Sequence, residues 1–327
     1  MNRRAIELVL RRGLRRAALA LGLAAAAGLA AAYPTRDVQL VVPFAPGGPV
    51  DGLARAFGAA LEGALGRTVN VVNREGGSFV VAANAVATAA ADGHTLYFGP
   101  PTPFTVHPHW MKSMPFKRED FTPVCQVVEN TFFVAVGPRS PITSFDALVE
   151  RAKAAPGRLQ YGHPGLSSVP HLAGAELAQR LGLQISDVPY RGESPMLVPL
   201  ANNDIDFAVV SAATTKAQQL RPLLVFAEQR LAAYPNVPTA RERGAPIVPS
   251  GFNGVFARAG TPEPVLARVE AACRTVAQSA ELRQRAELYT QDIEFLDRRA
   301  FAARVEAEVQ AKAALLKTVK IERLATH

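Results

Sequence analysis

Two segments of the sequence combine small residues with the start of a helical pattern, and this combination suits the binding of an anion. Residues 44–51 read FAPGGPVD, and residues 162–171 read GHPGLSSVPH. Each segment follows a strand-length apolar run and precedes apolar residues spaced three or four apart. The first turn of a helix carries unpaired N–H groups and the positive end of the helix dipole, which attract anions. One such loop is common in proteins, whereas two in separate parts of the chain predict a shared site.

The sequence signals for catalysis are weaker than those for anion binding at these loops. Residues 165–169 (GLSSV) superficially resemble the turn that presents a catalytic serine in hydrolases, but the second glycine of that motif is missing. The patterns GxxxxGKS/T, HExxH and GxGxxG, which indicate nucleotide, zinc and dinucleotide sites, do not occur. We therefore expect a protein that is not an enzyme and that holds no metal and no cofactor.

The elements that must position the two loops follow from the alternation of apolar runs with helical patterns. This alternation predicts an α/β fold with parallel strands and crossover helices, and 327 residues exceed the size of one typical core. Residues 125–136 predict an extended segment that crosses between lobes. We expect one lobe from residues 33–135 and 226–327, with the second lobe, residues 136–225, inserted between its halves.

Helix boundaries next to the loops can also be predicted. After the first loop, helical spacing begins at Val50 and should end at Gly66, since glycine favours the position that follows a helix. After the second loop, which we expect to reach Pro170, a helix should run from His171 to Leu181.

The N-terminus has the pattern of an export signal. Six arginines and only one acid fall in residues 1–16, and an apolar run of 13 residues follows at 17–29. A membrane span needs about 20 apolar residues, so this run is short for one. The small residues that end at Ala32 suit signal peptidase. We expect a signal peptide at residues 1–32, cleavage after Ala32 and a periplasmic protein; an uncleaved anchor or a buried Ala-rich helix is the alternative.

Charge and cysteine content limit the partners. The formal charge is +8, but without residues 1–32 the chain has 30 basic and 27 acidic residues, so we expect no nucleic-acid partner. Cys125 and Cys273 are the only cysteines, and their spacing fits no metal or redox motif. An exported protein permits a disulfide between them, although two buried thiols fit the sequence equally well.

Several segments together resemble one known family. Seven segments are similar, in order and spacing, to the periplasmic receptors of tripartite tricarboxylate transporters, the Bug-type solute-binding proteins. They are residues 33–77, 91–99, 121–129, 159–177, 188–200, 234–244 and 256–269. The resemblance covers nearly all of the chain after residue 32. It implies two α/β lobes of the type II periplasmic-binding-protein fold. It also implies a carboxylate ligand in the cleft between the lobes, held by backbone amides and waters of the two loops.

The resemblance assigns the two loops to the ligand. Asp51 matches the family's loop aspartate, which we interpret as a brace of the loop or a helix cap, with a solvated acid as the alternative. Ser167 and Ser168 offer hydrogen-bond donors, and His171 is either a ligand contact or a structural residue. The expected ligand-binding residues are Ala45, Pro46, Gly47, Gly48, Val50, Asp51, Gly165, Ser167, Ser168 and His171.

Some residues depart from the family pattern. Pro49 and Val50 stand where the family commonly has Gly followed by Thr or Ser, so an N–H and a hydroxyl are lost. Glu75, Phe79 and Ala82 replace a usual proline and two usual glycines, which predicts a bulkier wall. These changes favour a ligand that is less charged or more aromatic than the usual acids.

The sequence therefore predicts an exported, monomeric receptor that captures a small organic carboxylate, or a related polar or aromatic solute, by hinge closure. The resemblance implies that it delivers this solute to the membrane permease subunits of a tripartite tricarboxylate-type transporter. A sensor that presents its solute to a membrane signalling protein would have the same sequence features. A serine hydrolase is the third interpretation.

Overall fold

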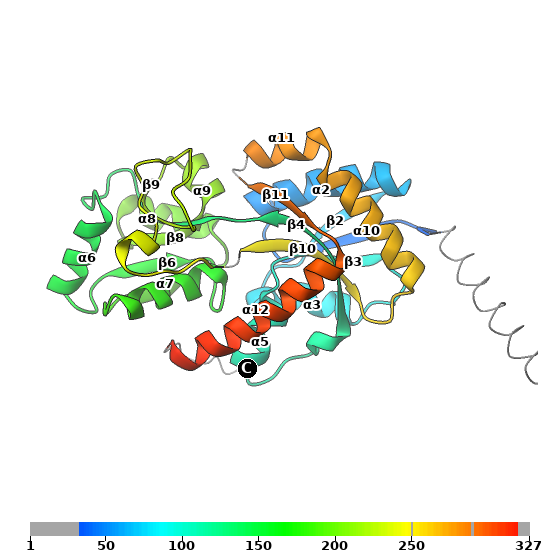
Figure 1. Cartoon of the computed structure of the whole chain (residues 1–327), viewed down its shortest axis with the longest axis horizontal. Helices are drawn as coiled ribbons and strands as arrows, with labels where there is room; N and C mark the ends of the chain where they lie inside the picture. Colours follow the sequence, from blue (N-terminus) through cyan, green and yellow to red (C-terminus); the bar gives the residue numbers. More distant parts are fainter. Residues whose placement is uncertain (1–32, 250, 289–290, 320–327) are drawn as a thin grey trace, which may run out of the picture.

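The protein consists of two α/β lobes, each built around its own sheet (Figure 1). The computed structural model describes residues 33–249, 251–288 and 291–319. The expected signal peptide, residues 1–32, lies outside the described residues, and so does Ala32, the expected cleavage position. None of the helices in the described ranges is long and apolar enough to cross a membrane. The two sheets with their helices confirm the predicted α/β fold, but the expectation of parallel sheets holds only in part, because each sheet also contains antiparallel pairs.

The first lobe contains a six-stranded sheet with helices on both faces. Its strand order is β11-β4-β10-β3-β1-β2, in which β1, β2 and β3 are parallel and β10 is antiparallel to β3 and β4. The strands are β1 (Val38–Val42), β2 (Val69–Asn73), β3 (Thr95–Gly99), β4 (Phe121–Glu129), β10 (Phe252–Arg258) and β11 (Asp292–Leu296). The helices are α2 (Pro49–Leu65), α3 (Val80–Ala87), α4 (Thr102–Thr105), α5 (His107–Trp110), α10 (Glu263–Ala277), α11 (Ala280–Leu288) and α12 (Arg298–Thr318).

Alternate residues of β1 explain why both faces of this sheet are covered. Leu40 packs into a core with α2, α10 and α11, whereas its neighbour Val41 packs into a second core with α3, α4 and α12. A parallel strand buried on both faces needs consecutive apolar residues, and Leu40, Val41 and Val42 supply them, whereas Gln39 near the start of the strand is exposed. The helix α2 turns Leu53, Phe57 and Leu61 towards the first core.

The second lobe is smaller and has a five-stranded sheet. Its order is β7-β6-β8-β5-β9, again with apolar cores on two faces. The strands are β5 (Phe132–Val136), β6 (Gln160–His163), β7 (Ser186–Pro189), β8 (Phe207–Ser211) and β9 (Arg221–Phe226). The helices are α6 (Phe145–Ala154), α7 (Val169–Arg180), α8 (Leu197–Asn202) and α9 (Ala212–Ala217).

The chain passes from the first sheet to the second between β4 and β5, and it returns at β10 (Figure 1). The boundary expected at residues 135/136 lies earlier, before Phe132, because β5 pairs with β8 and β9 of the second sheet from Phe132 onward. The boundary expected at 225/226 lies later in the chain. Ala240 and Ile247 pack in the core of the second lobe, so the return lies between Ile247 and Phe252.

Both helices that follow the loops start slightly earlier than their apolar spacing predicts. α2 begins at Pro49, and Gly66 ends it with a φ of +76°, as expected. α7 begins at Val169 rather than at His171, because the Ser168 hydroxyl accepts a hydrogen bond from the His171 N–H and caps the helix there. Pro170 fits within this first turn, where an N–H has no helical partner.

A disulfide joins Cys125 of β4 to Cys273 of α10, with a Cα–Cα distance of 6.6 Å. Both cysteines are fully buried in the first core. The sequence left this pairing open, and the structure places it within the first lobe. The two cysteines are 148 positions apart, and the inserted lobe lies between them. The bond therefore connects the part of the first lobe before the insertion to the part after it.

Replacing both cysteines by alanine should lower the free energy of unfolding by about 2–5 kcal/mol, because the bond restricts the unfolded chain. Denaturant unfolding with and without reductant measures this, and the reduced parent should lose a similar amount. Mass spectrometry after alkylation of the unreduced, denatured protein checks the bond itself. Two alkylated thiols would show that it does not form.

Candidate functional site

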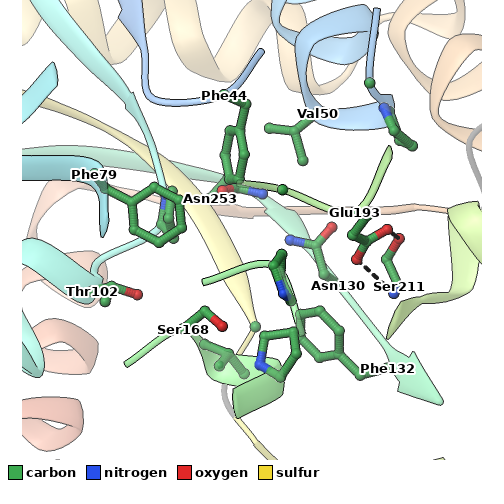
Figure 2. Close-up of a pocket in the computed structure, with 18 of the residues that line it drawn as sticks. Phe44, Val50, Phe79, Thr102, Asn130, Phe132, Ser168, Glu193, Ser211 and Asn253 are labelled. Atoms are coloured by element: carbon green, nitrogen blue, oxygen red, sulfur yellow. Dashed lines mark hydrogen bonds between the residues drawn. The ribbon is translucent and has the colours of Figure 1, made fainter. Parts of the chain in front are cut away.

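Both lobes contribute to one pocket (Figure 2). Its first-lobe walls come from the β1–α2 loop, the start of α2, the 3-10 turn at Gly77–Phe79, the loop after β3 and the start of β10. Its second-lobe walls come from β5, the β6–α7 loop, the segment after β7 and the end of β8. The lining residues are Phe44, Ala45, Gly48, Pro49, Val50, Phe79, Pro100, Thr102, Asn130, Phe132, Pro164, Ser168, Val169, Pro170, Arg191, Gly192, Glu193, Ser194, Pro195, Ser211, Gly251, Phe252 and Asn253.

The first loop places only part of its predicted residues at the pocket. Ala45, Gly48 and Val50 line it, whereas Pro46 and Gly47 do not. Gly48 precedes α2, and no side chain caps the helix, so its first turn remains available to a ligand. Gly47 has a φ of +86°, which glycine adopts without strain, and it shapes the turn rather than the wall.

Asp51 braces the loop from behind, as one of the sequence interpretations proposed. Its buried carboxylate accepts hydrogen bonds from the Gly47 N–H at 2.9 Å, the Arg55 Nε at 2.9 Å and the Asn73 Nδ2 at 2.7 Å. Asn73 also donates to the Phe44 carbonyl at 2.9 Å. Burial opposes ionisation, but these hydrogen bonds and the Arg55 charge lower the pKa of Asp51 below its usual value.

In the second loop, Ser168 is the predicted residue that lines the pocket, and Gly165 and Ser167 do not. Ser167 is fully buried and has a φ of +60°. Its hydroxyl donates to the Leu166 carbonyl at 2.6 Å and accepts from the Nε2 of His107, which belongs to α5 of the first lobe, at 2.9 Å. Ser167 therefore connects the two lobes instead of contacting a ligand.

The Ser167–His107 pair is a poor candidate for a hydrolase. The serine is buried away from the pocket, and its proton is engaged by a carbonyl. The Nδ1 of His107 is buried without a hydrogen-bond partner among the described residues, so no acid orients the imidazole. Burial also lowers the pKa of His107 to about 3, far below the range of a useful base at neutral pH.

His171 supports the second loop and does not line the pocket. Its Nδ1 accepts the Ser167 N–H at 2.9 Å, and its ring stacks on that of His163 with centroids 4.3 Å apart. Burial and the neighbouring His163 lower the pKa of His171 to about 4, so the ring is neutral at pH 7. The structural interpretation of this residue agrees with the geometry.

One group of potential metal ligands lies beneath this loop. Side-chain atoms of His163, His171 and Asp187 lie within 4.8 Å of one another. Because the Ser167 N–H occupies the Nδ1 of His171, the neutral ring carries its proton on Nε2, the atom 3.7 Å from Asp187. That nitrogen has no free lone pair for a metal. The group is better suited to hydrogen bonding than to coordination.

Two phenylalanines form an apolar wall (Figure 2). The rings of Phe44 and Phe79 pack with centroids 5.2 Å apart. Phe79 has a φ of +77°, an uncommon conformation for a bulky residue, at a position where the sequence resemblance implies glycine. Of the three substitutions expected to make the wall bulkier, only Phe79 reaches the pocket. Glu75 is exposed, and Ala82 packs in the core of the first lobe.

The opposite side of the pocket carries polar groups beside the ring of Phe132 (Figure 2). Figure 2 shows Glu193, Ser211 and Asn130 near one another and away from Phe79 and Thr102. Glu193 accepts hydrogen bonds from the Ser211 N–H at 2.9 Å and the Ser211 hydroxyl at 2.8 Å, and also from the Thr214 hydroxyl. The sequence did not point to these residues, because none of them lies in the two glycine-rich loops, although Ser211 caps α9 and Glu193 precedes a 3-10 turn. Their positions just after β4, after β7 and at the end of β8 were the available signal.

Comparisons with known proteins agree with this architecture. Residues 53–319 match the sequence model described as tripartite tricarboxylate transporter family receptor. Protein BugT of Bordetella pertussis is 35% identical over 249 residues, which cover 72% of this chain and 76% of BugT.

Solved structures are similar as well. R. palustris Rpa4515 with adipate has a TM-score of 0.82 at 29% identity, over 88% of this chain and 98% of that chain. MatC from Rhodopseudomonas palustris with bound malate has a TM-score of 0.78 at 27% identity, over 87% of this chain and all of that chain.

The Asp51 brace has a measurable contribution to stability. Asp51→Ala should lower the free energy of unfolding at pH 7 by about 2–3 kcal/mol, because charge-assisted hydrogen bonds to a buried carboxylate are lost. The matched control is Asp146→Ala, which removes an exposed first-turn acid of α6 that pairs with Arg243. This control should cost less than about 1 kcal/mol.

The pH dependence has a defined sign. Because the folded-state pKa of Asp51 is lowered, its contribution is fully present above the unfolded value of about 4 and is lost as pH falls through the folded value. The difference in stability between parent and Asp51→Ala should therefore shrink at acid pH. Equal losses for Asp51→Ala and Asp146→Ala at pH 7 would contradict the brace.

Proposed function

The chain belongs to the tripartite tricarboxylate transporter receptor family, and we propose that it binds a small organic carboxylate between its lobes. We further propose that it does so as an exported receptor and delivers the solute to the permease subunits of a transporter of this class. The observation that carries the proposal is that the starts of α2 and α7, one from each lobe, line the same pocket.

The donors available to the ligand can be counted from the two helix starts. Pro49 and Pro170 have no N–H, and Ser168 already caps the His171 N–H. The N–H groups of Val50 and Asp51 at α2 and of Val169 at α7 remain, together with the Ser168 hydroxyl proton. A carboxylate has about four lone-pair sites, and each charge-assisted hydrogen bond contributes about 1.5–3 kcal/mol. Water can complete the remaining contacts.

The mechanism follows from the position of these donors on different lobes. A carboxylate that contacts both helix starts binds better when the lobes are close together, so binding favours the closed form. The backbone segments that connect the lobes, between β4 and β5 and before β10, are where such a hinge would bend. A permease that contacts both lobes could then distinguish loaded from empty receptor.

A thermal-shift screen of the protein without residues 1–32 tests carboxylate binding. Mono- and dicarboxylates, aromatic acids and neutral amides of similar size form the panel. A ligand present at 100 times its Kd should stabilise the protein by about 2.7 kcal/mol. Stabilisation by neutral amides alone, or by no compound, would contradict the proposed ligand class. Hydrolysis of a generic ester that depends on Ser167 would support the hydrolase instead.

The expected signal peptide leads to a separate prediction about the N-terminus of the exported protein. Protein recovered from the periplasm should begin at Tyr33, because cleavage is expected after Ala32, and N-terminal sequencing reads this directly. A mature chain that keeps the arginines of the leader would contradict cleavage at this position. Recovery of the chain only in the membrane fraction would contradict its release.

The first turn of α2 can be changed to test its role. Pro49→Gly with Val50→Thr should improve binding of the best carboxylate from the screen about tenfold, or about 1.4 kcal/mol, because an N–H and a hydroxyl are added. The added flexibility of glycine opposes this gain by about 0.4–1 kcal/mol. Calorimetry on parent and variant measures the change. Unchanged or weaker binding, with an intact circular dichroism spectrum, would show that this loop does not hold the carboxylate.

A further inference from the structure

Glu193 places a carboxylate on the wall of a pocket that should receive an anion. The residue follows β7 and lines the pocket, and its side chain is partly buried. Three neutral groups donate to it: the N–H and hydroxyl of Ser211, and the hydroxyl of Thr214. Within residues 33–249, 251–288 and 291–319, no basic side chain forms an ion pair with Glu193. Its charge is therefore solvated by dipoles and not by a cation.

The hydrogen bonds of Glu193 leave one acceptor position open. Oε2 accepts from the two hydroxyls, whereas Oε1 accepts only from the Ser211 N–H. Each carboxylate oxygen has two lone pairs, so Oε1 can accept one further donor. A ligand N–H or O–H at this place would complete the set. A ligand carboxylate at the same place would offer no donor and would add a second negative charge.

The local surroundings make that second charge costly. Burial raises the pKa of Glu193 above its usual value, although the three hydrogen bonds act in the opposite direction. A carboxylate that is already poorly solvated repels a neighbouring anion more strongly than one in water does. The charge of Glu193 would therefore weaken the binding of a dianion beside it. This repulsion disappears only if Glu193 takes up a proton.

The pocket thus has different chemistry along its length. The starts of α2 and α7 offer donors through Val50, Val169 and Ser168. Phe44 and Phe79 form the apolar wall, and Glu193 with Ser211 forms the acceptor side (Figure 2).

Building on the proposed carboxylate receptor, we propose that Glu193 determines specificity. The preferred ligand has one carboxylate, an apolar or aromatic body and a hydrogen-bond donor such as an amide, hydroxyl or ammonium at its far end. Dicarboxylates are disfavoured, because their second carboxylate meets the Glu193 oxygen that needs a donor. Arg191 lines the pocket but is exposed, so solvent screens its attraction for a second carboxylate.

Matched ligand sets test this proposal by calorimetry at pH 7.5. Each set contains a dicarboxylate, its monoamide and the corresponding amino acid, with straight chains of four to eight carbons or a 1,4-substituted benzene ring. In the parent protein, the monoamide or amino acid of the best set should bind at least tenfold more tightly than its dicarboxylate. This comparison requires no variant.

Glu193→Gln then tests the residue itself. The amide keeps a similar shape, and its oxygen can still accept the Ser211 N–H, so the fold should be retained. The preference over the dicarboxylate should fall to within about threefold, mainly because the dicarboxylate binds better. Glu150→Gln is the matched control, since it removes the same charge from an exposed position on α6 of the same lobe and should leave the preference unchanged.

The outcomes separate this proposal from the proposed function. A parent that binds the dicarboxylates as tightly as their monoamides would remain a carboxylate receptor but would overturn the role of Glu193. A Glu193→Gln protein that is folded and keeps the full preference would also overturn it. Failure of every compound, including the monocarboxylates, to bind the parent would contradict both proposals.

Discussion

The backbone N–H groups at the start of a helix need an acceptor, and the loops before α2 and α7 meet this need in different ways. At α7, the Ser168 hydroxyl caps the His171 N–H, and Pro170 removes another donor. At α2, no side chain caps the first turn, and Asp51 turns its carboxylate back to the loop instead. The first turn of α2 therefore keeps its remaining N–H groups free of side-chain caps, while the Asp51 carboxylate within that turn offsets part of the helix dipole. The surrounding structure holds these two starts opposite each other.

Buried polar residues behind the loops serve this positioning. Asp51 accepts three hydrogen bonds on the side of the loop that faces away from the pocket, and His171 accepts the N–H of Ser167. The hydrogen bonds from the N–H groups of Gly47 and Ser167 fix the backbone of two loops that each contribute residues to the pocket. Such buried polar residues resemble ligand contacts in a sequence, since they are polar and occur within the ligand loop. The structure separates the two roles for Asp51 and His171, which do not line the pocket, whereas Ser168 both caps α7 and lines the pocket.

The sequence predicted features that depend on local spacing and missed those that depend on chain crossings. The end of α2 at Gly66 and the contact of Asp51 with the Gly47 N–H follow from residues within one loop–helix unit. Glu193 and Asn130 reach the pocket only because two sheets are placed side by side, and no local pattern encodes that placement. Phe79 was predicted only in part. A comparison with the family pointed to a bulkier wall, but only the packing showed that Phe79, and not Ala82, forms it.

The Cys125–Cys273 bond has a topological consequence for the inserted lobe. The bond closes a covalent ring that contains β5 to β9, and therefore all of the second sheet. A protease that cuts an exposed loop of this lobe once would open the ring without releasing a fragment. The nicked receptor would still migrate as one molecule without reductant, and both helix starts would remain on connected chains. A single cut in the inserted lobe would thus not by itself dissociate the protein.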